Sequence, residues 1–411
     1  MDYINRAAEK LAKEAVETYK SILVTGARQT GKSTMLEALF PDRKVVTFDD
    51  QFAEDQAKNN PTEFIDLNPP PVTYDEVQYV PSLFRYIKIA CDASKDTGLF
   101  CLTGSQPFKL MKTASESLAG RVSIIELSTL SLREMQKTDF DQSFVPTMEY
   151  VKARQKSAKK PKNIWSIIHR GGYPALQNPK MNCERFFSDY IKTYLERDVR
   201  ALSAVQDLNT FRRFMIACAA RTGQMLNYSN IASEISKDAD TVKNWISILE
   251  ASGIIYILEP YCPSVLNRAI KTPKLYFRDT GLACYLTRWL TPETLANGAM
   301  AGEIFETYVI SEILKSYSNA GIDYHYCVSY YRGKDKKNSS ESEIDFLIEK
   351  DGLLYPVEIK KTSKPAADMT SAFTILDNIP EKKRGTGAVV CMCSAPGVLR
   401  ENILAIPVWY V

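Results

Sequence analysis

The first third of the chain alternates short apolar runs with amphipathic stretches. β-type apolar segments lie within residues 21–25, 44–48, 70–78, 98–106 and 117–127. The segment that follows the first run, STMLEALF, has the apolar spacing of a helix. Strands that alternate with helices are typical of a parallel sheet covered by helices. The pattern therefore predicts an α/β domain at the start of the chain.

The middle of the chain has a different pattern. A charged stretch with a Lys-Lys-Pro sequence, residues 148–166, indicates a boundary or an exposed connection. Residues 227–261 read as a short helix, a turn, a longer helix that ends at Gly253, and a β-type run. This layout predicts a winged helix-turn-helix. Its second helix is expected to expose Asp240, Thr241, Lys243, Asn244 and Ser247. One lysine beside acids is a poor set for phosphate contacts, so we favour a packing module over a DNA-binding one.

In the last third of the chain, the pattern of apolar and polar residues predicts a helix followed by strands. An amphipathic helix is expected over residues 301–317 and a tyrosine-rich strand over 324–332. A hairpin is expected over 343–362, because an Asp-Gly pair separates two strand-like runs. On the second of these runs, Glu358 and Lys360 alternate with apolar residues and so share one strand face.

Composition narrows the class of protein. A chain of 411 residues favours roughly two to four domains. No apolar run is long enough for a membrane span, and the charged N-terminus differs from a secretory signal, so no membrane partner is expected. Nine cysteines without a C-x-x-C pair favour a reducing, cytoplasmic setting, and two histidines disfavour histidine-based metal chemistry. Residues 151–270 carry 18 Lys or Arg against 10 Asp or Glu, which fits either a polyanion partner or a solvated helical surface.

The sequence GARQTGKST contains a phosphate-binding motif of the form G-x-x-x-x-G-K-[ST]. It lies between a strand-like run and a helical run, which is the setting that the motif requires. The two glycines let the backbone fold around phosphate oxygens, the lysine neutralises the β- and γ-phosphates, and the first hydroxyl holds Mg²⁺. We therefore expect ATP and Mg²⁺ as cofactors. The expected nucleotide-binding residues are Gly26, Ala27, Arg28, Gln29, Thr30, Gly31, Lys32, Ser33 and Thr34.

Two acids end the third apolar run. Asp75 is expected to hold Mg²⁺ through water, and Glu76 to polarise the attacking water, a pair that suits a hydrolase. The end of the fourth run offers Ser105, or less readily Thr103, to sense the γ-phosphate. Arg121 precedes the fifth run and could reach the nucleotide of a neighbouring subunit, which would require a homo-oligomer. A surface arginine or an ion pair is the alternative reading of that residue.

These motifs, with a strand inserted between them, resemble the ASCE branch of P-loop ATPases. GARQTGKST, TYDEVQ, LTGSQ and SLAGRV resemble the AAA-type ATPases of bacteria and archaea that carry a C-terminal domain of unknown function with a nuclease-like fold. The resemblance implies a parallel sheet, a helical lid, a winged helix-turn-helix and a restriction-endonuclease-like α/β domain. The expected boundaries are residues 1–150 for the ATPase core, 151–222 for the lid, 223–265 for the winged helix and 266–411 for the nuclease-like domain.

An acid followed thirteen residues later by E-x-K resembles the PD-(D/E)XK nuclease core. The resemblance implies that Asp345 and Glu358 hold Mg²⁺ and that Lys360 orients water or stabilises the reacting phosphate. Glu306 fits the helix acid of such sites, with Glu303 as the second choice. The proline that gives the motif its name is missing, because Glu-Ile precedes the acid. The alternative is an ion-pair cluster on a binding scaffold.

Three functions compete. The first is Mg²⁺-dependent ATP hydrolysis coupled to a nuclease-like domain that acts on nucleic acid. The second is a nucleotide-dependent interaction switch whose nuclease-like domain is inactive and binds a partner. The third, a small-molecule kinase, explains the phosphate-binding loop but leaves Glu76 and the long C-terminal part without a role.

Overall fold

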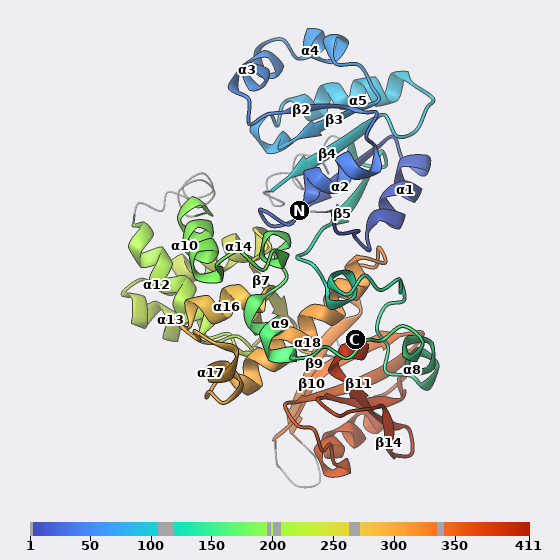
Figure 1. The fold of residues 1–411 in the computed structure, drawn as a ribbon, viewed down its shortest axis with the longest axis vertical. Helices are drawn as coiled ribbons and strands as arrows, with labels where there is room; N and C mark the ends of the chain where they lie inside the picture. The colour runs from blue at the N-terminus through green and yellow to red at the C-terminus, as the bar shows by residue number, and fades with distance from the viewer. Residues whose placement is uncertain (1–2, 106–117, 195–198, 200–206, 263–271, 335–340) are drawn as a thin grey trace.

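The N-terminal part of the chain forms a parallel sheet, drawn in blue to teal at the top of Figure 1. The computed structural model describes the chain except for residues 1–2, 106–117, 195–198, 200–206, 263–271 and 335–340. The strands are β1 (Ser21–Thr25), β2 (Lys44–Thr47), β3 (Val72–Asp75), β4 (Phe100–Gly104) and β5 (Val122–Glu126). Their order is β2-β3-β4-β1-β5, and every pair is parallel. The predicted parallel α/β arrangement is confirmed here.

Helices cover both faces of this sheet. Neighbouring residues of a strand point to opposite sides, so a strand of consecutive apolar residues needs a cover on each face. Ile22 and Val24 of β1 pack with α1 and α2, whereas Leu23 packs with α3, α4 and α5. The helices are α1 (Glu9–Thr18), α2 (Lys32–Leu39), α3 (Gln51–Asn59), α4 (Pro61–Leu67) and α5 (Leu83–Ala93). Central strands β1 and β4 are buried along their whole length, as is typical of parallel strands covered by helices on both faces.

The strand ends align along one edge of the sheet. Thr25 lies level with Gly104 on one side and with Glu126 on the other, and Thr47 lies level with Asp75. The polar residues that follow the apolar runs therefore meet at the carboxyl edge, where open α/β sheets bind ligands.

The middle of the chain combines helices with a small antiparallel sheet. Its helices are α7 (Leu132–Met135), α8 (Met148–Gln155), α9 (Ile164–Arg170), α10 (Cys183–Tyr194), α12 (Leu208–Ala219), α13 (Tyr228–Ile235), α14 (Ala239–Ala251), α16 (Thr280–Leu286) and α17 (Pro292–Ala296). Its strands are β6 (Gln224–Met225), β7 (Ile255–Leu258) and β8 (Lys274–Phe277), in the order β6-β8-β7. We call α12, α13, α14 and these strands the three-stranded module. Its third strand lies beyond residue 265, the predicted end of the winged helix.

The C-terminal part packs a long helix on a mixed sheet. The helix is α18 (Ala301–Ser318), and a 3₁₀ turn, η4 (Tyr324–Tyr326), follows it. The strands are β9 (Val328–Lys334), β10 (Glu341–Lys350), β11 (Leu353–Lys360), β12 (Lys383–Arg384), β13 (Gly387–Cys391), β14 (Gly397–Arg400) and β15 (Ile403–Pro407). Strands β9, β10 and β11 are antiparallel, whereas β11, β13 and β15 are parallel. The predicted hairpin is confirmed, with Asp351 and Gly352 as its two-residue turn.

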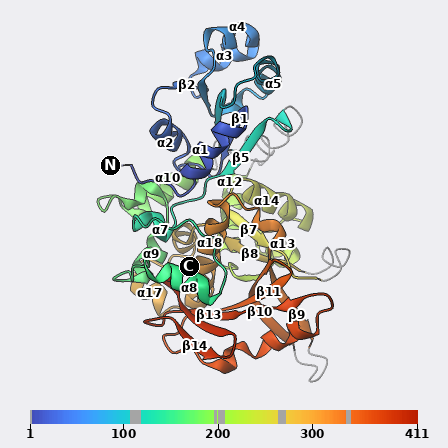
Figure 2. The same ribbon diagram turned by 90° about the vertical axis from the view of Figure 1, so that its right-hand side faces the viewer.

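The middle and C-terminal parts share one core. One cluster of buried apolar residues extends from Leu132 to Val411, separate from the two clusters of the N-terminal sheet, and two smaller clusters lie beside the C-terminal sheet. Helix α18 contacts β8 as well as β11. Figure 2 shows the three-stranded module between the N-terminal sheet above and the C-terminal sheet below. Within the described residues, no helix has the length and apolar character needed to cross a membrane.

Candidate functional site

The phosphate-binding loop joins β1 to α2 and depends on its glycines. Gly26 has a φ of 141°, and a Cβ there would lie 2.2 Å from the carbonyl oxygen of Leu127. Gly31 has a φ of 91° and directly precedes α2. Residues with a Cβ rarely adopt either of these backbone conformations. The sequence-predicted loop therefore has the backbone shape that only glycine permits at these two positions.

Lys32 and Ser33 lie in the first turn of α2, at the carboxyl edge of the sheet. The Lys32 side chain is buried, and its Nζ donates to the carbonyl oxygens of Ala27 (2.9 Å) and Gly26 (3.2 Å). The ammonium group thus lies inside the loop. The Ser33 hydroxyl donates to Asp75 at the end of β3.

Asp75 is the centre of this edge. Besides Ser33, it accepts hydrogen bonds from Thr103 Oγ1 at 2.5 Å and Thr47 Oγ1 at 3.2 Å. These hydroxyls come from α2, β4 and β2, so four segments meet at one carboxylate. A carboxylate that faces three hydroxyls is a set of oxygen ligands of the kind that Mg²⁺ takes in proteins.

Glu76 follows Asp75 in a left-handed conformation with a φ of 56°. A residue with a Cβ pays a steric cost there, and such strain concentrates at functional sites. Its backbone N–H donates to Thr103 Oγ1 at 3.1 Å, and its carboxylate accepts from Ser105 Oγ at 3.0 Å and from Gln78. The structure thus brings together Glu76 and Ser105, the two residues expected to act on water and on the γ-phosphate.

Arg121 lies at the other end of the sheet. It immediately precedes β5, whose first residue is level with the start of β1, so a whole strand separates it from the loop, about 16 Å at the usual rise per residue. Its guanidinium binds Asp92 of α5, with Nε 2.5 Å from Oδ1. Within one chain, Arg121 therefore forms an ion pair, which was the alternative interpretation from the sequence. A role in a neighbouring subunit stays a prediction.

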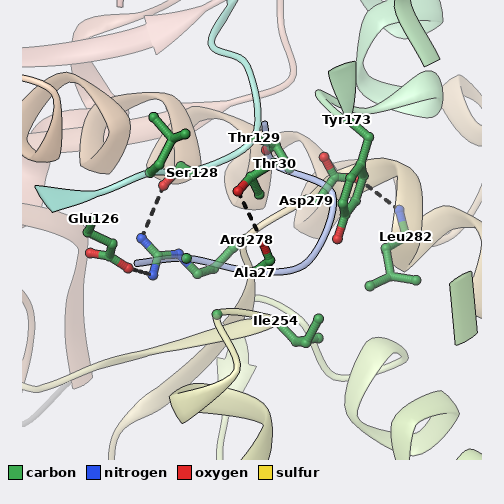
Figure 3. Close-up of a pocket in the computed structure, with 13 residues that line it drawn as sticks. Ala27, Thr30, Glu126, Ser128, Thr129, Tyr173, Ile254, Arg278, Asp279 and Leu282 are labelled. Carbon is green, nitrogen blue, oxygen red and sulfur yellow. Dashed lines mark hydrogen bonds and ion pairs between the residues drawn. The ribbon is translucent and has the colours of Figure 1, made fainter. Parts of the chain in front are cut away.

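The back of the phosphate-binding loop packs against the rest of the chain, as Figure 3 shows. Ala27 and Thr30 line a cavity of about 10 Å³ together with residues that follow α14 and β8. Within it, Arg278 reaches Glu126 at the end of β5 and donates to Ser128 Oγ at 3.3 Å. The same guanidinium donates to the Tyr324 hydroxyl at 2.9 Å. One arginine after β8 therefore links the edge of the N-terminal sheet to the C-terminal part.

The predicted nuclease-like residues also come together. Lys360 Nζ lies 2.9 Å from Asp345 Oδ2 and 2.8 Å from Glu358 Oε2. Asp345 also accepts from the backbone N–H of Ile359 at 2.8 Å. Burial and the charge of Asp345 raise the pKa of Glu358 to about 9. The hairpin therefore places two largely buried carboxylates and one ammonium group in mutual contact.

Glu306 of α18 faces this group, whereas Glu303 lies beside Gly223. Burial and the charge of Asp345 raise the pKa of Glu306 to about 7. The Glu306 carboxylate accepts from the Tyr276 hydroxyl at 2.5 Å and lies 3.6 Å from Lys274 Nζ. Lys274 Nζ also lies 2.5 Å from Glu343 of β10. We call Glu306, Glu343, Asp345, Glu358, Lys360, Lys274 and Tyr276 the acid cluster.

The acid cluster does not fit a divalent cation in this arrangement. Such an ion needs several carboxylate oxygens that converge on one point. Here each acid directs an oxygen to a lysine or a tyrosine. No group of three acids, histidines or cysteines in the described part of the chain is placed to hold a metal.

In α14, the second helix of the predicted winged helix-turn-helix, the one lysine is engaged within the chain. Lys243 pairs with Asp240 at 3.2 Å and lies 6.0 Å from the ring centre of Tyr228. Asn227 caps the preceding helix α13. These contacts agree with the preference for a packing module.

Sequence reasoning missed three cationic residues. Arg6 donates to the carbonyl oxygen of Thr30 at 2.7 Å and pairs with Glu134 at 2.9 Å, so it anchors the phosphate-binding loop. Lys274 is the first residue of β8, and Arg278 directly follows the strand. The segment KLYFRD does alternate polar and apolar positions, which indicates a strand with one polar face. The partners of that face lie far away in the chain, so the pattern alone does not reveal them.

Three families match successive parts of the chain. Residues 18–136 match a family described as AAA domain. Residues 161–293 match Domain of unknown function (DUF8612), and residues 301–411 match Domain of unknown function (DUF4143). Lys274 and Arg278 therefore belong to the second segment, and all four acids of the acid cluster belong to the third.

Two relatives extend over most of the chain. Uncharacterized protein Rv2008c of Mycobacterium tuberculosis and Uncharacterized protein Mb2031c of Mycobacterium bovis are each 25% identical over 383 residues. These matches cover 90% of this chain and 77% of each relative.

Solved structures show weaker likeness. The Walker-type ATPase PABY2304 of Pyrococcus abyssi is 14% identical and covers 69% of this chain and 96% of its own, with a TM-score of 0.44. The AMPPCP-bound DnaA from Aquifex aeolicus is 17% identical and covers 61% and 89%, with a TM-score of 0.30. The domain match, the glycine-rich loop after β1 and the strand order β2-β3-β4-β1-β5 support a P-loop NTPase fold for the N-terminal part of the chain, which is similar to AAA domains.

Proposed function

We propose that this chain is a Mg²⁺-dependent ATPase whose nucleotide state acts on its C-terminal part. The observation that carries the proposal is the hydrogen bond between Ser33 and Asp75 at the edge that also holds the phosphate-binding loop. A hydroxyl after the loop lysine and a carboxylate at a neighbouring strand end are the groups with which P-loop NTPases hold Mg²⁺. The donor set fits that ion, which when bound would neutralise charge on the phosphates.

The residues of the edge have separate proposed roles. Lys32 lies inside the loop and is proposed to bind the β- and γ-phosphates. Glu76 is proposed to orient the attacking water and accept its proton, and Ser105, 3.0 Å from it, to contact the γ-phosphate. Arg121 is proposed to act only in a homo-oligomer, where it would have to leave Asp92.

Measured ATP turnover tests this proposal. Lys32→Ala should abolish turnover because it removes phosphate binding. Glu76→Gln should lower turnover by about 10²–10⁴-fold with little change in ATP affinity, because it removes a general base and keeps the shape of the side chain. Glu63→Gln, an exposed glutamate on α4, is the matched control and should hydrolyse ATP at the wild-type rate. Wild-type turnover in both site variants would overturn the proposal.

For the C-terminal part we propose a nuclease-like fold that binds a partner without cleaving it. What favours binding over cleavage is the contact of its acids with Lys360 and Lys274. The three-stranded module is proposed to be a winged helix-turn-helix that packs between the two ends. Nucleic acid is the partner class that the basic middle segment favours.

A cleavage assay separates this proposal from an active nuclease. Single-stranded and double-stranded DNA and RNA are incubated with the full chain, ATP and either Mg²⁺ or Mn²⁺. We expect no cleavage above the level of an Asp345→Ala variant. Metal-dependent cleavage that disappears in Asp345→Ala would show an active nuclease and contradict the binding role.

A further inference from the structure

The acid cluster contains a cation that comes from outside the C-terminal part. Its acids come from α18, β10 and β11, and Lys360 comes from β11. Lys274 and Tyr276 come from β8 of the three-stranded module, where alternate residues share one strand face. A strand of another part of the fold thus extends two polar side chains into the place where a nuclease-like domain would hold its metal.

Lys274 is held there by several contacts. It is 4% exposed, and its Nζ lies 2.5 Å from Glu343 Oε1 and 3.6 Å from Glu306 Oε1. The same ammonium lies 5.3 Å from the ring centre of Tyr330 on β9. A buried ammonium group without partners would be costly, so these acids and the ring determine where this side chain can lie.

Removal of Lys274 would take away one of the two ammonium groups of the acid cluster. Lys360 already contacts Asp345 and Glu358. Without Lys274, the ammonium contacts of Glu306 and Glu343 are lost, and four carboxylates face one ammonium group. Such an excess of acidic groups, three of them largely buried, favours a bound cation.

The position of β8 also depends on the N-terminal domain. Arg278, which lies four residues after Lys274, binds Glu126 at the end of β5 and donates to Ser128. Strand β8 is therefore anchored at one end beside the phosphate-binding loop and at the other end in the acid cluster. These charged contacts at both ends of β8 keep Lys274 in the cluster.

We propose that Lys274 is a resident cation that keeps the acid cluster closed to divalent metal, and that the cluster binds such a metal once the charge of Lys274 is removed. This inference rests on the proposed nuclease-like character of the C-terminal part. It explains why the predicted metal-binding acids come together and still do not form a metal site.

Equilibrium binding of Mn²⁺ to the full chain without nucleotide, followed by electron paramagnetic resonance, tests the inference. Wild-type protein should show no Mn²⁺ site that depends on Asp345. Lys274→Met should gain one site that depends on Asp345, with an affinity at least about tenfold above the upper limit set by the wild-type titration, the size of effect that groups beside a metal commonly have. The double variant Lys274→Met/Asp345→Asn should lose that site, which separates it from any ion bound at Ser33 and Asp75.

Two controls keep the test sharp. Lys274→Arg retains a cation and should bind Mn²⁺ as wild type does. Lys361→Met removes a lysine from the end of the same hairpin, whose Nζ donates to the carbonyl oxygen of Ala296, and should also leave binding unchanged. Far-ultraviolet circular dichroism shows whether each variant is folded; if Lys274→Met is not, Lys274→Gln replaces it.

The inference would be overturned if a folded Lys274→Met or Lys274→Gln variant bound Mn²⁺ as the wild type does. An Asp345-dependent Mn²⁺ site in the wild type would also overturn it. ATP turnover is measured separately on the wild type. Its absence would overturn the proposed ATPase and leave the Mn²⁺ result standing, so the two failures can be told apart.

Discussion

At the scale of single residues, the phosphate-binding loop is held in place by the ion pair between Arg6 and Glu134. Arg6 and Glu134 are both 3% exposed at their side chains, and Glu134 also accepts from the backbone N–H groups of Ala7 and Ser131. Because Arg6 donates to Thr30 and Ser128 as well, it ties the loop to the strand end beside it. The loop shape thus depends on a residue that precedes the first helix.

Replacement of Arg6 by methionine should lower the free energy of unfolding by about 3–5 kcal/mol, because it leaves the Glu134 carboxylate buried without its cation. Denaturant titration measures the change. Lys10→Met is the matched control: the Lys10–Asp141 pair is about two-thirds exposed, so its loss should have little effect. Equal effects of the two substitutions would contradict the structural role of Arg6.

The same pair predicts a dependence on pH. Burial alone would raise the pKa of Glu134, but Arg6 and the backbone N–H groups outweigh it and hold the pKa below its usual value. A carboxyl with a lowered folded-state pKa stabilises the fold above the unfolded pKa, about 4.3, and loses that contribution as the pH falls through the folded value. Between about pH 5 and pH 3, wild-type protein should lose more stability than Arg6→Met. Parallel curves would contradict this origin of the acid sensitivity.

At the scale of elements, the loop and the strand next to it leave no room for a side chain. The clash predicted for a Cβ on Gly26 is with a backbone carbonyl at the end of β5, which cannot rotate away as a side chain could. Strand pairing of β1 with β5 therefore constrains the phosphate-binding loop from one side, and α2 constrains it from the other.

Gly26→Ala should abolish binding of a non-hydrolysable ATP analogue, because both its φ of 141° and the carbonyl of Leu127 oppose a methyl group. Isothermal titration calorimetry measures this. Gly302→Ala is the control: a Cβ there has open space, and alanine in a helix is about 0.5–1 kcal/mol more favourable than glycine. It should bind the analogue as wild type does. A Gly26→Ala variant with intact binding would show that the loop adopts another shape.

At the scale of the whole molecule, three parts of the chain meet behind the phosphate-binding loop. A Cβ on Gly253, at the turn before β7, would lie 3.3 Å from the backbone nitrogen of Ala27. Arg278 joins Glu126 to Tyr324 in the same region. A change in the loop on nucleotide binding must therefore move these neighbours or be resisted by them, since packed interiors yield little.

Nucleotide binding should thus change hydrogen exchange beyond the N-terminal sheet and its helices. Hydrogen exchange with a non-hydrolysable ATP analogue should slow at residues 253–258 and 274–278 as well as in the loop, because the contacts behind the loop become more ordered. Arg278→Met should keep the protection in the loop and weaken it at 274–278. Protection confined to residues 26–34 in the wild type would contradict coupling through this region.

The sequence by itself determined the local parts of this protein. The parallel sheet, the phosphate-binding loop, the acids at the end of β3 and the Asp-Gly hairpin were all predicted, because each is encoded by neighbouring residues whose spacing reflects one helix or strand. The grouping of Glu306, Asp345, Glu358 and Lys360 was expected from a family resemblance, which already contains tertiary information.

Only the tertiary structure decided which charges meet. Arg6 contacts residues beyond position 100, Arg278 reaches back to β5, and Lys274 enters a cluster of later acids. Such pairs leave no periodic trace, because the chain path that brings them together is set by the packing of whole elements. The physical consequence is largest at the acid cluster, where a lysine from β8 turns a predicted metal site into a closed network of ion pairs.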